Sequence, residues 1–138
     1  MGRILAIDYG MKRVGIAVTD PLRLIATPLR SIEQKKLITF LTDYIKTETV
    51  EIFVIGAPKR LNNTNTHLTV EVENFIKVLN IKFPNILVET IDERFTSKIA
   101  SQEILASGIG KKDRMNKERV DLVSATLILQ SYLIRMKI

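Results

Sequence analysis

The sequence contains no cysteine and only one histidine among its 138 residues. The lack of cysteine excludes disulfide bonds, thiolate zinc sites and cysteine nucleophiles, and it is typical of a reducing compartment. The single histidine, His67, lies in a polar segment, and we expect no catalytic role for it because a histidine base depends on its placement. No apolar run approaches the roughly 18 to 20 residues needed to span a bilayer, and no signal-peptide pattern opens the chain. We therefore expect a cytoplasmic protein without membrane association.

Acidic residues are in the minority, because 21 lysines and arginines outnumber 15 aspartates and glutamates and give a formal net charge of +6 at pH 7. A basic excess of this size is compatible with nucleic acid, acidic lipid headgroups or acidic proteins as partners. Hydrophobic residues make up 46% of the chain and charged residues 26%, which is ordinary for a globular protein. The length is that of one domain with one adequate core, so we expect a single domain over residues 1–138.

Apolar runs of strand length alternate with segments of helical periodicity. The first two runs are joined by a short segment containing Gly10, which predicts an antiparallel hairpin. Ser31 and Gln34 have the spacing of a capping box, which predicts the start of a helix. The expected strands cover residues 4–7, 14–18, 23–29, 51–58 and 85–92, and the expected helices lie near residues 31–45, 70–79, 96–105 and 116–135. A hairpin followed by strand–helix–strand units predicts an α/β fold with a mixed sheet and helices on its faces.

Acidic residues stand at three places where their charge is unexpected. Asp8 follows the first buried run, and Asp92 and Glu93 follow the last. Ligand sites in open α/β sheets lie outside the carboxyl ends of the strands. Adjacent residues of an extended chain point to opposite faces, so at most one of Asp92 and Glu93 would enter such a site. Asp121 lies inside an apolar helix, where a carboxylate is costly unless it is paired, protonated or bound to a metal.

Carboxylates that converge from these places would form an all-oxygen site, which suits Mg²⁺ or Mn²⁺ rather than zinc. Two such ions about 3.5 to 4 Å apart can activate water and stabilise the leaving oxygen of a phosphodiester. Structural roles remain open for the same residues. Asp8 could be a turn residue, and Asp121 could pair with Lys117 or with a buried arginine. Asp20, which ends the second apolar run, is expected to organise the next turn rather than to bind metal.

Basic residues crowd the segment before the last helix, where Lys111, Lys112 and Arg114 precede Asp121. Such a segment could contact phosphates and position nucleic acid without reading its sequence, or it could be a solvated charged loop. Arg13 and Arg94 are better placed for phosphate binding, because each lies within a few residues of a candidate metal ligand.

Four segments resemble the motifs of the YqgF/RuvX family, whose members are named for Holliday junction resolution and for nuclease action on pre-16S rRNA. "DYGMKRVGIAVTD" at residues 8–20 resembles the family signature D-x-G-x-x-R-x-G-x-A-x-x-D. "GAP" at residues 56–58 resembles its G-x-P element, and "DERFTS" at residues 92–97 its D-E-R element. "KERVDLVSATLILQSYL" at residues 117–133 resembles its C-terminal helix with an embedded aspartate. The resemblance covers essentially the whole chain, with the motifs in the family's order.

The resemblance implies an RNase H-like fold with a five-stranded sheet, in which three antiparallel strands are followed by two parallel ones. It also implies a metal-dependent nuclease that acts on structured nucleic acid in the cytoplasm and matures the 5′ end of small-subunit ribosomal RNA. Carried over by motif position, Asp8, Glu93 and Asp121 become the catalytic metal ligands for Mg²⁺ or Mn²⁺, and Arg13 and Arg94 become phosphate-binding residues. The expected partners are nucleic acid, with RNA favoured over DNA, and pre-ribosomal particles, for a protein that is a monomer or a homodimer.

The chain departs from the family pattern after the "GAP" element. The family often has a further glycine there, whereas this chain has "GAPKRLNNTNT". More distant resolvases place an acid at the end of this strand, where this chain has Gly56, Ala57 and Pro58. Three other functions stay open: a Holliday junction resolvase, a non-catalytic assembly factor, and a phosphotransferase of the actin, sugar-kinase and Hsp70 group. The last disagrees with the short chain, since those proteins enclose their nucleotide between two such domains.

Overall fold

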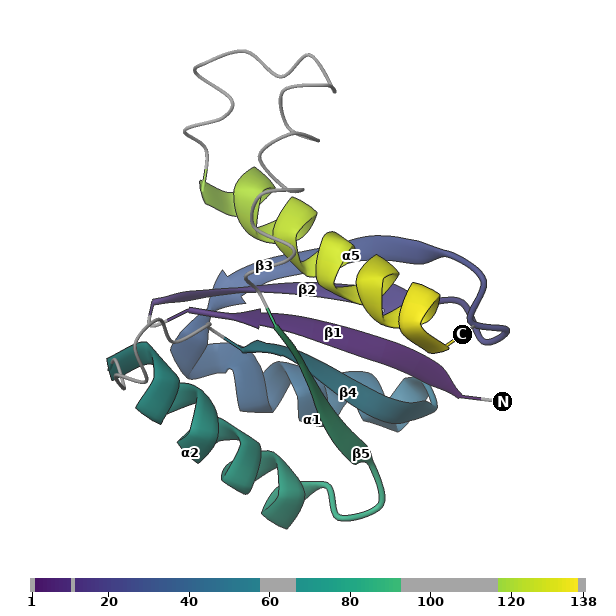
Figure 1. Ribbon diagram of the computed structural model, residues 1–138. Coiled ribbons are helices and arrows are strands. Elements are labelled where there is room, and N and C mark those ends of the chain that lie inside the picture. The colour runs from purple at the N-terminus through teal and green to yellow at the C-terminus, as the bar shows by residue number, and fades with distance from the viewer. Residues whose placement is uncertain (1, 11, 58–66, 93–116, 137–138) are drawn as a thin grey trace.

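The computed structural model describes residues 2–10, 12–57, 67–92 and 117–136. Within these ranges the chain forms five strands, and α-helices lie above and below them in Figure 1. The strands are β1 (Arg3–Tyr9), β2 (Arg13–Thr19), β3 (Ala26–Glu33), β4 (Val50–Ala57) and β5 (Leu87–Asp92). The helices are the 3₁₀ turn η1 (Gln34–Lys36), α1 (Leu37–Thr47), α2 (His67–Lys82) and α5 (Lys117–Met136).

The strands form one mixed sheet in the order β3-β2-β1-β4-β5. The pairs β1–β2 and β2–β3 are antiparallel, whereas β4 runs parallel to β1 and β5 runs parallel to β4. This arrangement confirms the mixed five-stranded sheet expected from the sequence. Because β1, β4 and β5 run in the same direction, their carboxyl ends lie at the same edge of the sheet.

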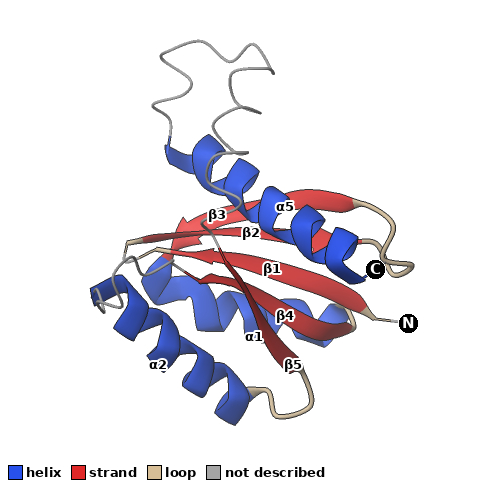
Figure 2. Cartoon of the chain, in the orientation of Figure 1, coloured by secondary structure: helices blue, strands red, loops and turns tan. Residues whose placement is uncertain are grey.

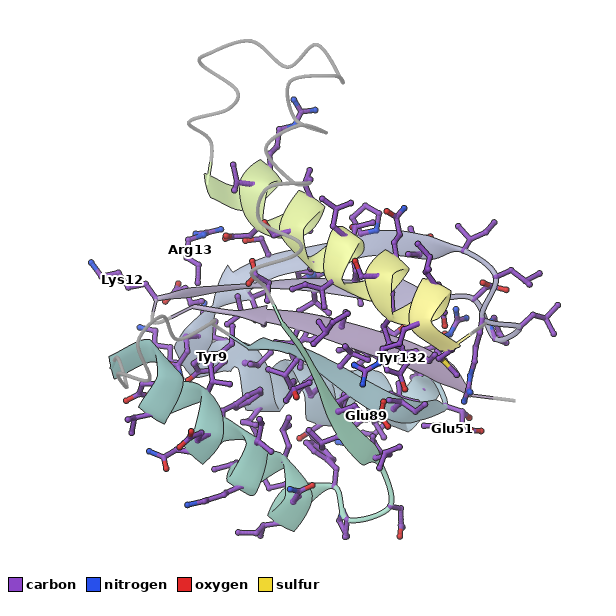
Figure 3. The ribbon with its side chains drawn as sticks, viewed as in Figure 1. Tyr9, Lys12, Arg13, Glu51, Glu89 and Tyr132 are labelled. Carbon is purple, nitrogen blue, oxygen red and sulfur yellow. The ribbon has the colours of Figure 1, made fainter. Side chains whose placement is uncertain are left out.

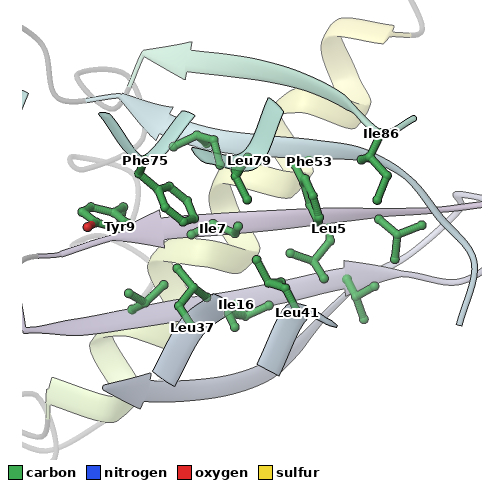
Figure 4. Close-up of a cluster of buried hydrophobic side chains, with 14 of the residues drawn as sticks. Leu5, Ile7, Tyr9, Ile16, Leu37, Leu41, Phe53, Phe75, Leu79 and Ile86 are labelled. Atoms are coloured by element: carbon green, nitrogen blue, oxygen red, sulfur yellow. The ribbon is translucent and has the colours of Figure 1, made fainter. Parts of the chain in front are cut away.

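Helices cover both faces of the sheet, with α1 and α2 on one face and α5 on the other (Figure 2). Strand β1 is buried on both sides, which explains its continuous apolar run. Its residues Leu5, Ile7 and Tyr9 pack with α1 and α2 (Figure 4), whereas Ile4 and Ala6 pack with α5. We call the side that Ile4 and Ala6 occupy the α5 face.

The third strand begins three residues later than the apolar pattern predicted, at Ala26 instead of Arg23. The reason is a turn organised by Asp20, whose Oδ1 accepts hydrogen bonds of 2.8 Å from the backbone N–H groups of Leu24 and Ile25. Arg23 has a φ of 59°, which no β-strand accommodates. The expectation that Asp20 organises the turn is confirmed, and the amide hydrogen bonds, that of Ile25 first, lower the pKa of its carboxyl group.

The helix start predicted at Ser31 is wrong, because Ser31 lies within β3 and pairs with Gly15. Its supposed capping partner, Gln34, donates a 2.6 Å hydrogen bond from its side chain to the hydroxyl group of Tyr9. Helix α1 begins instead at Leu37, after the 3₁₀ turn, and no side chain caps its first turn. The capping-box pattern is local, and cross-strand pairing with β2 overrides it here.

The other element boundaries agree with the sequence to within a few residues. Strand β5 begins at Leu87 rather than Asn85, and α2 begins at His67, earlier than the apolar periodicity indicated. Helix α5 ends within one residue of the expectation. The helix expected at residues 96–105 lies outside the described residues. In the described ranges, no helix combines the length and the apolar character needed to cross a membrane.

Helix α5 lies against β2 at one point of very close approach, the glycine at position 15. A Cβ atom at Gly15 would collide with the backbone carbonyl oxygen of Asp121 and would lie 3.0 Å from the Asp121 Cβ atom. Only a residue without a side chain therefore allows the helix backbone to rest on the strand here. This contact places Asp121 directly over the centre of the hairpin.

The other end of α5 contacts β5 through Tyr132, which is buried and lies beside Glu89 in Figure 3. Its hydroxyl group donates a hydrogen bond to the Glu89 carboxylate. Burial, followed by this carboxylate, raises the pKa of Tyr132 to about 12. The helix is thus held at Gly15 near its start and at Glu89 near its end.

Replacement Gly15→Ala is expected to destabilise the fold by about 1–3 kcal/mol, the usual cost of forcing extra atoms into a packed contact. The added methyl group must push the Asp121 segment of α5 away from β2. Urea unfolding at neutral pH measures the loss, and Thr27→Ala, at an exposed position of β3, is the control. Equal stability of Gly15→Ala and the wild type would contradict the close approach.

Replacement Tyr132→Phe is expected to change how stability depends on alkaline pH. The folded protein keeps the tyrosine proton up to pH about 12, whereas the unfolded chain loses it near the ordinary value of about 10. The stabilisation is therefore complete below pH 10 and is lost as the pH rises toward 12. Urea unfolding at several pH values should show this decline to be shallower in Tyr132→Phe, and parallel curves for the two proteins would contradict it.

Candidate active site

Asp8 is the next-to-last residue of β1 and points to the α5 face, in phase with Ile4 and Ala6. It pairs across the hairpin with Gly15 of β2, and Gly15 pairs in turn with Ser31 of β3. The three residues form a row across three adjacent strands at the hairpin end of the sheet. Since Gly15 has no side chain, the row leaves space above its centre for Asp121 of α5.

In the described part of the chain, Ser31 and Arg13 both contact the Oδ2 atom of Asp121. The Ser31 hydroxyl group donates a hydrogen bond of 3.2 Å, and Nε of Arg13 lies 3.5 Å away. Arg13 also donates from Nη2 to the Ser31 hydroxyl oxygen at 2.9 Å. The side chains of Arg13 and Asp121 are 31% and 23% exposed, so this ion pair lies at the mouth of the site rather than in the core.

The environment of Asp121 opposes its negative charge. Burial is the largest cause, the nearby charge of Asp8 is the second, and together they raise the pKa of the Asp121 carboxyl group. The hydrogen bond from Ser31 and the positive charge of Arg13 act in the opposite direction but do not cancel the increase. The fold thus brings two acids close enough to repel each other, which is the arrangement that a bound cation relieves.

A pocket of about 340 Å³ opens beside Asp121. The described residues that line it are Lys12, Arg13, Val120 and Asp121. Lys12 is exposed at the turn of the β1–β2 hairpin, and Figure 3 shows it extending outward beside Arg13. The pocket therefore combines a carboxylate with two cations that could contact a phosphodiester.

Two of the described side chains have the donor atoms that a hard divalent cation requires. Asp8 and Asp121 supply carboxylate oxygens, the donors that Mg²⁺ and Mn²⁺ prefer. Across the described ranges, no group of three acidic or histidine side chains gathers in one place. The third expected ligand, Glu93, lies outside the described residues, as do Arg94, Lys111, Lys112 and Arg114.

The structure thus brings together three of the residues singled out from the sequence: Asp8, Arg13 and Asp121. Of the structural alternatives, pairing of Asp121 with an arginine is present, and the arginine is Arg13. Ser31 was missed, because its spacing to Gln34 indicated a helix cap. Lys12 was not singled out from the sequence either, although its position next to Arg13 is a signal for phosphate contact.

Comparison with known proteins supports the family resemblance. A family model described as "RuvX: Holliday junction resolvase" matches residues 2–135. A protein of Amoebophilus asiaticus named "Putative pre-16S rRNA nuclease" is 50% identical over 133 residues, which is 96% of this chain and 94% of that protein. A protein of Bacteroides fragilis with the same name is 48% identical, with 96% of each chain covered.

A structural comparison supports the fold independently. The structure "T. thermophilus RuvC in complex with Holliday junction substrate" aligns with a TM-score of 0.57 over 99% of this chain and 96% of that one. The sequences are only 13% identical, so the match concerns the fold alone, and it confirms the RNase H-like fold. From the family model and the relatives of nearly equal length, we conclude that this chain belongs to the RuvX family.

Proposed function

We propose that this protein is a metal-dependent nuclease that hydrolyses phosphodiester bonds in structured nucleic acid. The observation that carries the proposal is the placement of two acids together at the carboxyl edge of the sheet: Asp121 rests on Gly15, the cross-strand partner of Asp8, next to Lys12 and Arg13. A site built only to bind phosphate would have no use for two acids, because they repel the ligand.

Asp8 and Asp121 would hold Mg²⁺ or Mn²⁺, with Glu93 as the third ligand. Glu93 is proposed rather than Asp92 because it occupies the position within "DERFTS" that matches the family's motif.

A divalent cation bound there supplies charge neutralisation at the phosphate and activation of the attacking water. Asp8 and Asp121 lie on different elements, a strand and a helix, and would hold the cation between the sheet and α5. Lys12 and Arg13 would contact the phosphate oxygens, with Arg94, Lys111, Lys112 and Arg114 as further contacts. The bond from phosphorus to the leaving oxygen breaks as the water oxygen bonds to phosphorus.

For the substrate, we propose the 5′ region of pre-16S rRNA, encountered in the cytoplasm on pre-ribosomal particles. The support is the name shared by relatives that are 48–50% identical over almost the full length of this chain. The net charge of +6 agrees with a nucleic acid partner but does not separate RNA from DNA.

A second candidate is cleavage of branched DNA, which the description of the matching family model favours. Both substrates need the same acid site, because hydrolysis of the two backbones requires the same stabilisation of charge at phosphorus. The two candidates therefore differ in substrate preference, and the site prediction that follows applies to both.

Replacement Asp8→Asn is expected to lower the cleavage rate by about 100-fold or more, because a metal ligand contributes several kcal/mol to the transition state. Binding of nucleic acid should be little changed. The assay uses labelled single-stranded RNA, a precursor rRNA leader, duplex DNA and a four-way junction, each with Mg²⁺, Mn²⁺ or EDTA. The matched control is Asp43→Asn. The Asp43 carboxylate is exposed on α1, and in the part of the chain that the structure describes it pairs only with Lys46.

Preference for the rRNA leader over the junction would support RNA processing, and the reverse would support junction resolution. Cleavage by Asp8→Asn at the wild-type rate would reject the acid site. Tight binding by the wild type without cleavage under any metal condition would indicate a non-catalytic assembly factor.

A further inference from the structure

We propose that Ser31 is a positioning residue that holds the Asp121 carboxylate in the orientation needed for metal binding. This inference rests on the proposed function, because it assigns Asp121 to the metal. Ser31 lies outside every motif that carries the family resemblance, and it reaches Asp121 from 90 positions away in the chain. Its role therefore follows from the three-dimensional arrangement alone.

The first argument concerns the direction of the hydrogen bonds. A serine hydroxyl group has one hydrogen to donate and two lone pairs to accept with. Arg13 can only donate, so its 2.9 Å contact from Nη2 uses a lone pair of Ser31. The hydroxyl hydrogen is then available for the Asp121 Oδ2 atom at 3.2 Å, and Asp121 is the acceptor. Arg13, Ser31 and Asp121 thus form a chain of donors that runs in one direction.

The second argument concerns how the two partners of Asp121 differ. Both contact its Oδ2 atom, Ser31 at 3.2 Å and Nε of Arg13 at 3.5 Å. Arg13 also lines the pocket together with Lys12, where its guanidinium group is placed to contact phosphate. Ser31 carries no charge, and it is not among the described residues that line this pocket. Its hydroxyl group can therefore orient the carboxylate without a second task at the phosphate.

The third argument concerns rigidity. Ser31 lies within the paired part of β3, opposite Gly15, and Gly15 is the residue on which the backbone of Asp121 rests. The sheet thus supports Asp121 at its backbone through β2 and at its carboxylate through β3. Residues that orient metal ligands in this way typically contribute about 10- to 100-fold to metal affinity or activity.

The test measures binding of Mn²⁺ alone to the metal-free full-length protein by isothermal titration calorimetry. We expect Ser31→Ala to weaken Mn²⁺ binding by about 10-fold or more. Ser31→Thr keeps the hydroxyl group and suits a strand, so it should retain near-wild-type affinity. Thr27→Ala removes an exposed hydroxyl group from the same strand and should leave the affinity unchanged. Thermal unfolding confirms that each variant is folded.

Steady-state cleavage provides a second readout that general destabilisation would not produce. If Ser31 serves the carboxylate, Ser31→Ala lowers kcat and leaves KM for nucleic acid unchanged at saturating Mn²⁺. A rise in KM with unchanged kcat would instead assign Ser31 to substrate binding and overturn the inference.

Asp121→Asn separates the two proposals. If Asp121→Asn loses Mn²⁺ binding while Ser31→Ala binds as the wild type does, the metal site stands and the role of Ser31 is rejected. An equal loss in Ser31→Ala and Thr27→Ala would reject it as well. If Asp8→Asn and Asp121→Asn both bind Mn²⁺ like the wild type, the metal site itself fails, and the inference fails with it.

Discussion

The contact between the backbone of α5 and Gly15 of β2 is the constraint on which the site depends. It brings the carbonyl group of Asp121 so close to the sheet that no side chain fits at position 15. Gly15 stands between Asp8 and Ser31 in the cross-strand pairing, so the contact places Asp121 between its acidic neighbour and its hydrogen-bond donor. Any residue other than glycine there would separate the acids and move Asp121 away from Ser31. The site therefore depends on a packing contact at a residue that has no chemistry of its own.

Electrostatics explains why such an arrangement needs a functional reason. A partly buried carboxylate next to a second one is unfavourable, and the raised pKa of Asp121 expresses that cost. Arg13 and Ser31 offset only part of it. If the pair of Arg13 and Asp121 served stability alone, Asp8 would be unfavourable, because its charge repels Asp121. An apolar residue at position 8 would pack at least as well without this repulsion. A divalent cation bound between the two carboxylates would offset their repulsion, which gives the arrangement a functional reason.

Much of this could be predicted from the sequence, and the exceptions have a common physical origin. The apolar runs of β1, β2 and β4 specify buried strands, and Asp8 and Asp121 are conspicuous because each interrupts an apolar pattern. Ser31 was assigned wrongly because a capping box is recognised from four consecutive residues, whereas its pairing with Gly15 depends on the register of two strands. Its contact with Asp121 spans 90 positions, a distance over which spacing rules carry no information. The start of β3 was missed for a similar reason, since the backbone hydrogen bonds to Asp20 override the apolar run that follows it.

The two described acids are not equivalent, and the difference bears on how the site is interpreted. Asp121 belongs to a network, so its removal also deprives Arg13 and Ser31 of an acceptor and mixes effects on metal, phosphate and packing. Asp8 acts on that network through its charge, from the central strand of the sheet. Loss of the Asp8 charge relieves the repulsion while the chain from Arg13 through Ser31 to Asp121 keeps its donors and acceptor. A defect caused by neutral Asp8 therefore reports on the need for a second negative charge, and that need is what distinguishes a cation-binding site from a surface that only holds phosphate.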